Sequence, residues 1–158
     1  MSETRKYTSK QMGDACEMLV AAELTLAGVP ALKVPDNWPG YDVVAHPPGR
    51  TQQAISVKSR TFKRGGATFV EYRAQDSFDW LAIVLLPGGG ETRRRIFIIP
   101  KSLADETARR DSPTAKTADL RYWRQDQIPD RFAAFENNFA LSANGSDGEP
   151  PAPGSAAI

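Results

Sequence analysis

The amino-acid sequence predicts an α/β domain in which a mixed central β-sheet is flanked by helices. Apolar residues recur at helical spacing from Lys10 to Ala27. A continuous apolar run covers Trp80 to Leu86, which is typical of a strand that is covered on both faces. Short β-branched and aromatic segments, bounded by Pro and Gly, lie before and after Gly49. A first helix, several strands and a later helical pattern together indicate this fold class.

The length and composition suit one soluble globular domain. Of the 158 residues, 41% are hydrophobic and 25% are charged. We expect this single domain over residues 1–142, followed over residues 143–158 by a disordered tail rich in Pro, Gly, Ser and Ala. The formal net charge is only +1, so any attraction to nucleic acid has to come from local clusters of basic residues.

Cysteine usage and hydropathy bear on the location of the protein. Cys16 is the only cysteine, which excludes an internal disulfide and any multi-cysteine zinc site. No uncharged apolar run approaches the length of about 18 residues that a membrane span needs, and the first residues lack the apolar segment of a secretion signal. We therefore expect a cytoplasmic protein without a membrane partner.

The first element is the helix from Lys10 to Ala27, which begins at Ser9 or shortly after and is ended by Gly28. Cys16 lies on its apolar stripe, so we expect a buried packing residue there and not a nucleophile. Glu17 lies on the shoulder of the same stripe. A helix-shoulder glutamate is usually a solvated side chain.

The remaining elements follow from β-branched runs and turn formers. We expect strands over residues 31–34, 41–45, 53–58, 67–73, 80–86 and 95–99, with the last pair joined in a hairpin around residues 88–90. Ser102 is expected to cap a short helix toward Arg110. A last helix is predicted over Arg131 to Leu141, because Phe132, Phe135 and Phe139 recur at helical spacing.

The strands on either side of the Pro- and Gly-containing turn carry the most informative residues. Because side chains alternate along a strand, Asp42 projects opposite to Tyr41 and Val43, while Ser56 and Lys58 share one face. A carboxylate and an ammonium group can therefore meet across the pair. The alternative interpretation is an ion pair on a solvated sheet face, which contributes little to stability.

The order of these residues resembles the core of the PD-(D/E)XK nuclease superfamily, which includes the Holliday junction resolvases. Members carry an acidic residue on a first helix, an Asp at the start of one strand, and Glu-x-Lys or Gln-x-Lys on the next strand. Glu17, Asp42 and the segment 56–58, Ser-Val-Lys, stand at these positions. Gly13 and Glu17 also reproduce the Gly-x-x-x-Glu-like arrangement of relatives. The resemblance covers residues 13–100 and implies a restriction-endonuclease-like core.

The resemblance implies catalytic roles for Glu17, Asp42, Ser56 and Lys58. In relatives the strand Asp is the main metal ligand, the backbone carbonyl of the middle residue, here Val57, adds a ligand, and the Lys positions water or stabilises charge. The helix acid orients a metal-bound water or helps to hold a second cation. The implied cofactor is Mg²⁺ or Mn²⁺, held weakly if at all. Ser56 departs from the pattern, because its neutral hydroxyl is a poor ligand for a hard divalent cation.

Basic residues gather directly after the motif strand. Arg60, Lys63, Arg64 and Arg73 are the residues that we expect to contact nucleic-acid phosphates, and the neighbouring glycines allow a close backbone approach. A second group, residues 93–95, is more typical of a solvated loop.

Two further residues can be interpreted either as solvent-exposed side chains or as metal ligands. Glu71 is a candidate for a relocated metal ligand that replaces the missing acid, and an exposed strand glutamate is the alternative. His46 would share a strand face with Asp42, but four residues at about 3.3 Å each put it about 13 Å away, too far to bind the same ion. We therefore expect His46 in a surface turn.

Three functions remain open. The first is a metal-dependent nuclease that acts on DNA. The second is a catalytically inactive member of the same fold that binds nucleic acid or a protein. The reason for this alternative is Ser56, which stands in place of the acidic residue. The third is an unrelated α/β domain in which Asp42 and Lys58 face solvent. Nucleic acid, DNA in the first place, is the expected partner, and a homodimer is left open.

Overall fold

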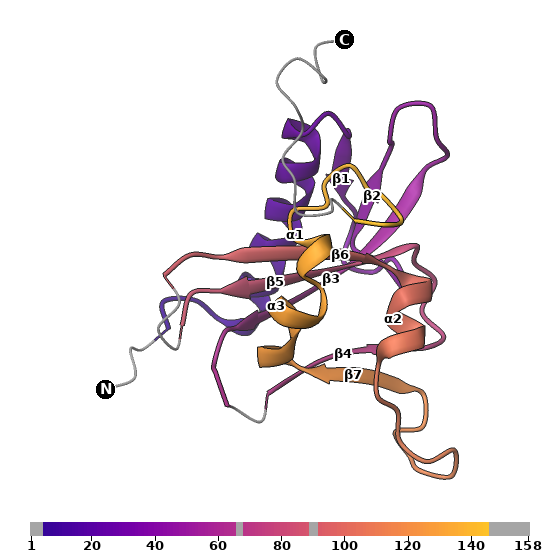
Figure 1. Ribbon diagram of the computed structural model, residues 1–158. Coiled ribbons are helices and arrows are strands. Elements are labelled where there is room, and N and C mark those ends of the chain that lie inside the picture. The colour runs from indigo at the N-terminus through magenta and orange to yellow at the C-terminus, as the bar shows by residue number, and fades with distance from the viewer. Residues whose placement is uncertain (1–4, 66–67, 89–91, 146–158) are drawn as a thin grey trace.

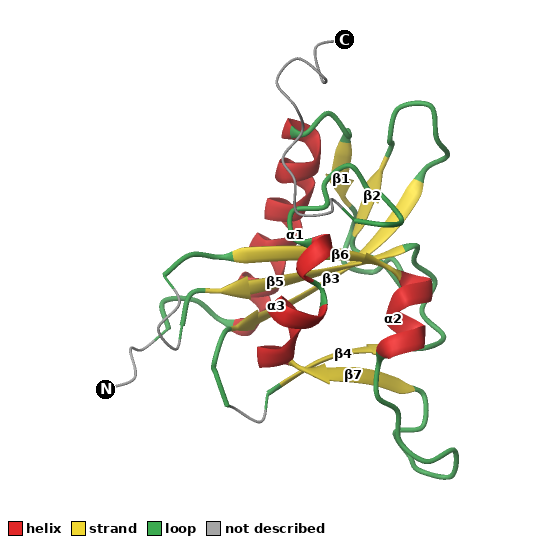
Figure 2. Ribbon diagram, viewed as in Figure 1, coloured by secondary structure: helices red, strands yellow, loops and turns green. Residues whose placement is uncertain are grey.

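The computed structural model describes residues 5–65, 68–88 and 92–145. A five-stranded sheet forms its centre, and a two-stranded sheet lies apart from it (Figures 1 and 2). None of the helices in these ranges is long and apolar enough to cross a membrane. The elements, in chain order, are α1 (Ser9–Leu26), β1 (Ala31–Lys33), β2 (Val43–Ala45), β3 (Gln53–Thr61), β4 (Phe69–Arg73), β5 (Trp80–Leu86), β6 (Arg95–Pro100), α2 (Lys101–Thr107), β7 (Leu120–Arg124), η1 (Gln125–Gln127), α3 (Ile128–Arg131) and η2 (Ala133–Phe135).

The central strand of the larger sheet is β3, since the strand order is β1-β2-β3-β5-β6. β2 is antiparallel to β3 and pairs with it only over residues 53–55. On the other side, β5 runs parallel to β3 along residues 55–61, and β6 is antiparallel to β5. The mixed sheet is confirmed. Because β3 continues beyond its pairing with β2, one side of its second half is left without a β2 partner.

Two hydrophobic layers hold the sheet. Helix α1 packs on one face, where the first core cluster includes Val20, Leu24, Val43, Ile55 and Val57. The opposite face packs on the β4–β7 sheet, α2 and α3, where the second core cluster includes Val70, Leu81, Ile83, Phe97 and Trp123. Alternate residues of β5 therefore enter opposite clusters, as a strand covered on both faces requires.

Local interactions fix the ends of α1. The Thr8 hydroxyl accepts a hydrogen bond from the Gln11 backbone N–H at 3.1 Å, and the Gln11 side chain accepts one from the Thr8 N–H at 2.9 Å. This capping box satisfies donors that have no partner within the helix. After Leu26 the chain turns at Gly28, whose φ of +97° suits glycine. Cys16 is buried within the helix, as predicted.

Each predicted strand has a counterpart, with one informative change. Ala67 of the predicted strand 67–73 and residues 89–90 of the predicted hairpin lie outside the described residues, within which β4 begins at Phe69 and β5 pairs antiparallel with β6. Strand β2 is shorter than the predicted 41–45, and the chain bends at Asp42. Tyr41 packs against the second core cluster and Val43 lies in the first, so the prediction that they share a face is wrong. Gly40, with a φ of +86°, precedes the bend that interrupts the alternation.

The predicted helix over Arg131 to Leu141 is also wrong. Only Ile128–Arg131 and the short turn at Ala133–Phe135 are helical, and Asn137 and Leu141 have positive φ values of 58° and 54°. The segment passes around edge strand β6, where the Asn137 N–H donates to the Ile96 carbonyl at 2.8 Å. The phenylalanines consequently serve both faces of the sheet, Phe132 in the second cluster and Phe139 against the first. One helix cannot present them to both.

Three smaller points concern helix α2, strand β7 and the predicted tail. Helix α2 begins at Lys101 after Pro100, without a side-chain cap, so Ser102 is not its N-cap. Strand β7 was not expected, and it pairs with β4 along its whole length. Of the predicted tail, residues 146–158 lie outside the described residues.

Candidate active site

The carboxylate of Asp42 lies against the unpaired side of β3. The Asp42 N–H donates to the Ile55 carbonyl at 2.9 Å, although the β2–β3 register places Val43 opposite Ile55. Two residues further along β3, the Val57 N–H donates to Asp42 Oδ2 at 2.8 Å. The side chain of Asp42 thus takes the place that a backbone carbonyl of a longer β2 would have. The bend at Asp42 brings the carboxylate to the edge of the sheet.

Strand β3 presents two further groups at this edge. In an antiparallel ladder the N–H and C=O of one residue point to the same neighbour, so the Val57 carbonyl is directed to the side on which Asp42 lies. Lys58 is half-buried, and its positive charge acts on Asp42. Lys58 has no hydrogen-bond or ion-pair partner among the residues that the structure describes. Ser56 is 3% exposed and shares the strand face of Lys58.

Helix α1 contributes Glu17 from the other face of the sheet. The glutamate is half-buried, and a Cβ added at Gly13 would lie 4.0 Å from its Oε2, so the absent side chain leaves room beside the carboxylate. Its negative charge and that of Asp42 act on one another. The structure therefore brings together Glu17, Asp42 and Lys58, which lie far apart in the sequence.

The pKa values of Asp42 and Glu17 are governed mainly by burial. Burial raises the pKa of Asp42, while the hydrogen bond from Val57 and the charge of Lys58 lower it. Burial is also the main reason why the pKa of Glu17 is raised, and the charge of Asp42 raises it further. Burial thus outweighs the lowering effect of Lys58 and Lys33 on these carboxyl groups. Carboxylate oxygens are the ligands that a hard divalent cation takes.

Comparison with solved structures identifies the architecture around this edge. The chain is similar to the bacterial homing endonuclease I-Ssp6803I, with a TM-score of 0.50 and 16% sequence identity over 73% of this chain and 89% of that chain. The fold is restriction-endonuclease-like. The Holliday junction resolvase Hjc of Archaeoglobus fulgidus is also similar, with a TM-score of 0.43 and 20% identity over 71% of this chain and 90% of that chain. No protein-family model and no curated protein matches the sequence.

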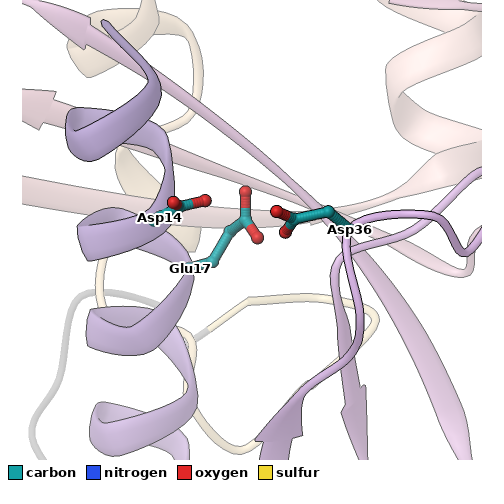
Figure 3. Close-up of side chains that lie close together, drawn as sticks. All are labelled: Asp14, Glu17 and Asp36. Atoms are coloured by element: carbon teal, nitrogen blue, oxygen red, sulfur yellow. The ribbon is translucent and has the colours of Figure 1, made fainter. Parts of the chain in front are cut away.

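In this restriction-endonuclease-like fold, a group of charged residues beside Glu17 was not expected from the sequence. Asp14, Glu17 and Asp36 each bring one carboxylate oxygen within 4.8 Å of the other two (Figure 3). The Lys33 ammonium lies 2.9 Å from Asp36 Oδ1 and 3.5 Å from Glu17 Oε1. Lys10 lies 2.9 Å from Asp36 Oδ2 and, with Lys33, lowers the pKa of Asp36 to about 2. The chain therefore supplies its own cation, Lys33, at the rim of the site.

A sequence signal for Lys33 and Asp36 was weak. Lys33 is on an edge strand and Asp36 in a loop of turn formers, both of which commonly carry solvated charges. Only the pairing of β1 with β2 places Lys33 opposite Val43, next to Asp42.

The predicted nucleic-acid residues lie in the last residues of β3, in the loop that follows it and on the smaller sheet. Arg60 donates to the Phe69 carbonyl at 2.8 Å and so ties β3 to β4. Lys63 and Arg64 are exposed in the following loop. Arg73 donates to Asp119 at 3.0 Å.

The loop after β3 is held by the 3-10 turn η1. Gln125 accepts a hydrogen bond from the Lys63 N–H at 3.2 Å, and Asp126 accepts one from the Gly65 N–H at 2.9 Å. Arg64 borders a shallow depression together with Arg124 and Arg131, neither of which was expected from the sequence. The basic loop after β3 is therefore held in a defined conformation by its hydrogen bonds to η1.

The residues with alternative interpretations can also be placed. His46 is exposed in the turn after β2, as predicted. Glu71 is exposed on β4, on the side opposite the buried Val70 and Tyr72. It belongs to the smaller sheet, whereas Asp42 lies at an edge of the larger sheet.

Proposed function

We propose that this protein is a metal-dependent nuclease that hydrolyses phosphodiester bonds in DNA. One observation carries the proposal: the Asp42 carboxylate is held on the open side of β3, where the charge of Lys58 acts on it and its own charge acts on Glu17. Carboxyl groups with raised pKa values beside Lys58, which has no hydrogen-bond or ion-pair partner in the described ranges, are typical of a catalytic site. The similarity of the fold to that of the homing endonuclease I-Ssp6803I supports phosphodiester hydrolysis as the reaction.

The donor set fits a divalent metal ion. Asp42, Glu17 and the carbonyl of Val57 offer oxygen atoms, which are the ligands that Mg²⁺ and Mn²⁺ prefer. When bound, such an ion polarises the phosphate and lowers the pKa of a coordinated water. The carboxyl groups of Asp42 and Glu17 are both partly buried, which raises their pKa values, and a bound cation would offset the cost of burying their charges.

The chain's own side chains complete the site. Lys58 keeps its ammonium available for a water or for the negative charge that develops on the phosphate. Ser56 supplies a hydroxyl where relatives have a charged or amide side chain, so we expect weak metal affinity in the absence of DNA. Arg60, Lys63, Arg64 and Arg73 would position the sugar-phosphate backbone without reading its sequence.

A plasmid cleavage assay with Mg²⁺ and with Mn²⁺ tests the proposal. Asp42→Ala and Lys58→Ala are each expected to lower the cleavage rate by a factor on the order of 100 or more. Glu106→Gln removes an exposed carboxylate from α2 and is the matched control, for which we expect the parent's rate. Cleavage that persists unchanged in Asp42→Ala would show that another site, or a contaminant, is responsible.

The burial of Ser56 favours a second candidate function. A residue that is 3% exposed and uncharged at the position of the missing acid is also what a catalytically inactive relative would carry. On this alternative the parent binds nucleic acid or a protein partner and leaves plasmid intact with either metal. Binding that survives Asp42→Ala, together with no cleavage by the parent, would favour the binding module.

A further inference from the structure

Trp38 differs from the other tryptophans in its exposure to solvent. It is 44% exposed, whereas Trp80 and Trp123 are 5% and 1% exposed in the two cores. Trp38 lies in the loop between β1 and β2, four positions before Asp42. Tryptophan is enriched at binding interfaces, because its ring combines a large apolar body with a polar N–H.

The indole is supported on one side by the core. The rings of Trp38 and Tyr41 meet edge to face, with centroids 5.9 Å apart and planes at 80°. Tyr41 in turn packs against the second core cluster. A contact of this kind uses one edge and one face, and Tyr41 is the only ring that contacts Trp38 among the described residues. With 44% of the residue exposed, Trp38 keeps solvent-accessible surface beyond its contact with Tyr41.

The loop that carries Trp38 is held in place. The backbone N–H of Trp38 donates to the Pro35 carbonyl at 3.1 Å. At Gly40 an added Cβ would lie only 3.0 Å from the Ser77 backbone nitrogen, so the loop fits closely against that segment. A ring on a fixed loop loses little conformational freedom when a ligand stacks on it.

The position of the ring relates it to the reacting phosphate. Tyr41 and Ala54 pack against the same core cluster, and Ala54 shares its strand face with Ser56 and Lys58. Through Tyr41, Trp38 is therefore linked to the core on the face of β3 that carries Ser56 and Lys58. The four residues from Trp38 to Asp42 span at most about 14 Å, which is within reach of the nucleotides next to a phosphate at Asp42.

We propose that Trp38 stacks on an unpaired nucleobase next to the phosphate held at Asp42, so that the preferred substrate has unstacked bases at that point. Every base has a π-face that can stack on an indole, and inside a duplex both faces are covered by neighbouring bases. Single strands, flaps and open junctions expose such faces, whereas a continuous duplex does not. The proposal rests on the nucleic-acid function proposed above and names its substrate class.

Binding without metal separates stacking from cleavage. The affinity of the parent, Trp38→Ala and Trp38→Phe is measured in EDTA by anisotropy of a labelled oligodeoxythymidylate and of a labelled blunt duplex. Trp38→Ala is expected to lose about tenfold in affinity for the single strand, and less than about twofold for the duplex. Trp38→Phe keeps a stacking ring and most of the affinity. Leu26→Ala, which truncates an 83% exposed residue at the end of α1, should match the parent.

Fluorescence provides an independent readout. Because the other tryptophans are buried, stacking on Trp38 is expected to quench the intrinsic emission on addition of the single strand, and Trp38→Phe should remove that quenching. Equal single-strand affinity of Trp38→Ala and the parent, or no single-strand binding by the parent, overturns the proposal whatever the plasmid assay gives. A parent that cleaves neither plasmid nor the oligodeoxythymidylate with Mg²⁺ or Mn²⁺, but loses single-strand binding on Trp38→Ala, overturns the nuclease and supports the stacking site.

Discussion

Two charged regions of this molecule use their charges differently. In the smaller sheet, arginines are engaged by carboxylates: Arg73 donates to Asp119 at 3.0 Å and Arg124 to Asp126 at 2.9 Å. At the edge of β3, Lys58 has no hydrogen-bond or ion-pair partner among the described residues, and burial raises the pKa of Asp42.

Two glutamates show the same contrast within one residue type. Arg95 holds Glu136 through two hydrogen bonds of 2.8 Å and lowers the pKa of its carboxyl. Glu17 has Lys33 at 3.5 Å, and its pKa is nevertheless raised by burial and by Asp42. The difference teaches that a fully paired carboxylate serves the architecture, whereas an incompletely paired one is available to a cation.

The largest expected effect is that of placing a charge at Ser56. Because this position is 3% exposed, we expect Ser56→Glu to lower the stability of the metal-free protein by several kcal/mol. The added oxygen ligand should also tighten Mg²⁺ or Mn²⁺ binding and raise any weak cleavage. Thermal unfolding with and without metal, together with calorimetric titration, measures both effects.

Ser56→Gln is the matched control, with the same length and no charge. It should share part of the destabilisation without the recovery on metal addition. A folded Ser56→Glu protein with no gain in metal affinity would mean that this edge of β3 is not a metal site.

The basic loop offers the second test. Replacing Arg60, Lys63 and Arg64 by Ala should weaken binding to all sequences by about tenfold or more and lower the slope of log affinity against log salt by about one per lost contact. Since Arg60 also ties β3 to β4, we expect the single Arg60 variant to lower the melting temperature, and the Lys63 and Arg64 double variant to leave it unchanged. A triple variant with the parent's slope would place the binding surface elsewhere.

Opposite shifts of stability with pH are the third expectation. The pKa of Glu136 is lowered in the folded protein, so its ionised carboxylate stabilises the fold at pH values above the pKa that it has in the unfolded chain. This stabilisation is lost as the pH falls through the pKa of the folded state. Glu136→Gln should therefore cost about 1 kcal/mol at pH 7 and converge with the parent in acid. The pKa of Asp42 is raised in the folded protein, so the fold favours its protonated form. The resulting stabilisation is present at low pH and is lost as the pH rises through the pKa of the folded state.

Asp42→Asn is accordingly expected to raise the melting temperature at pH 7, by roughly 2 °C, and to have no such benefit in acid. Thermal unfolding of both variants across a pH series checks the signs. Two variants that shift in the same direction at pH 7 would remove the distinction between the paired and the incompletely paired carboxylate.

The smallest effect is expected at Lys33. Its ammonium lies between Glu17 and Asp36, where it repels an incoming metal ion. Lys33→Met should tighten metal binding by a few-fold, which calorimetric titration measures. Lys10→Met is the control, since Lys10 pairs with Asp14 and Asp36 but is 70% exposed and should matter less. Equal affinities of the Lys33 variant and the parent would show that Lys33 does not oppose the metal.

The sequence by itself determined the elements whose signal is local. Helix α1 and strand β5 were predicted within a residue or two, because a helical stripe and a continuous apolar run each report a single environment along the whole element. The order of Glu17, Asp42 and Lys58 also indicated the restriction-endonuclease-like fold that the structure has.

The tertiary structure alone decided where side chains serve two faces or meet across strands. Residues 131–141 have helical spacing, but their phenylalanines divide between two cores on opposite sides of β6, which no single helix can do. Asp42 leaves the alternation of its strand because the chain bends there and its carboxylate bonds to Val57. Lys33 joins the site only through the pairing of β1 with β2. Periodicity reports one face of one element, whereas the pKa of a buried carboxyl depends on charges that distant segments bring to it.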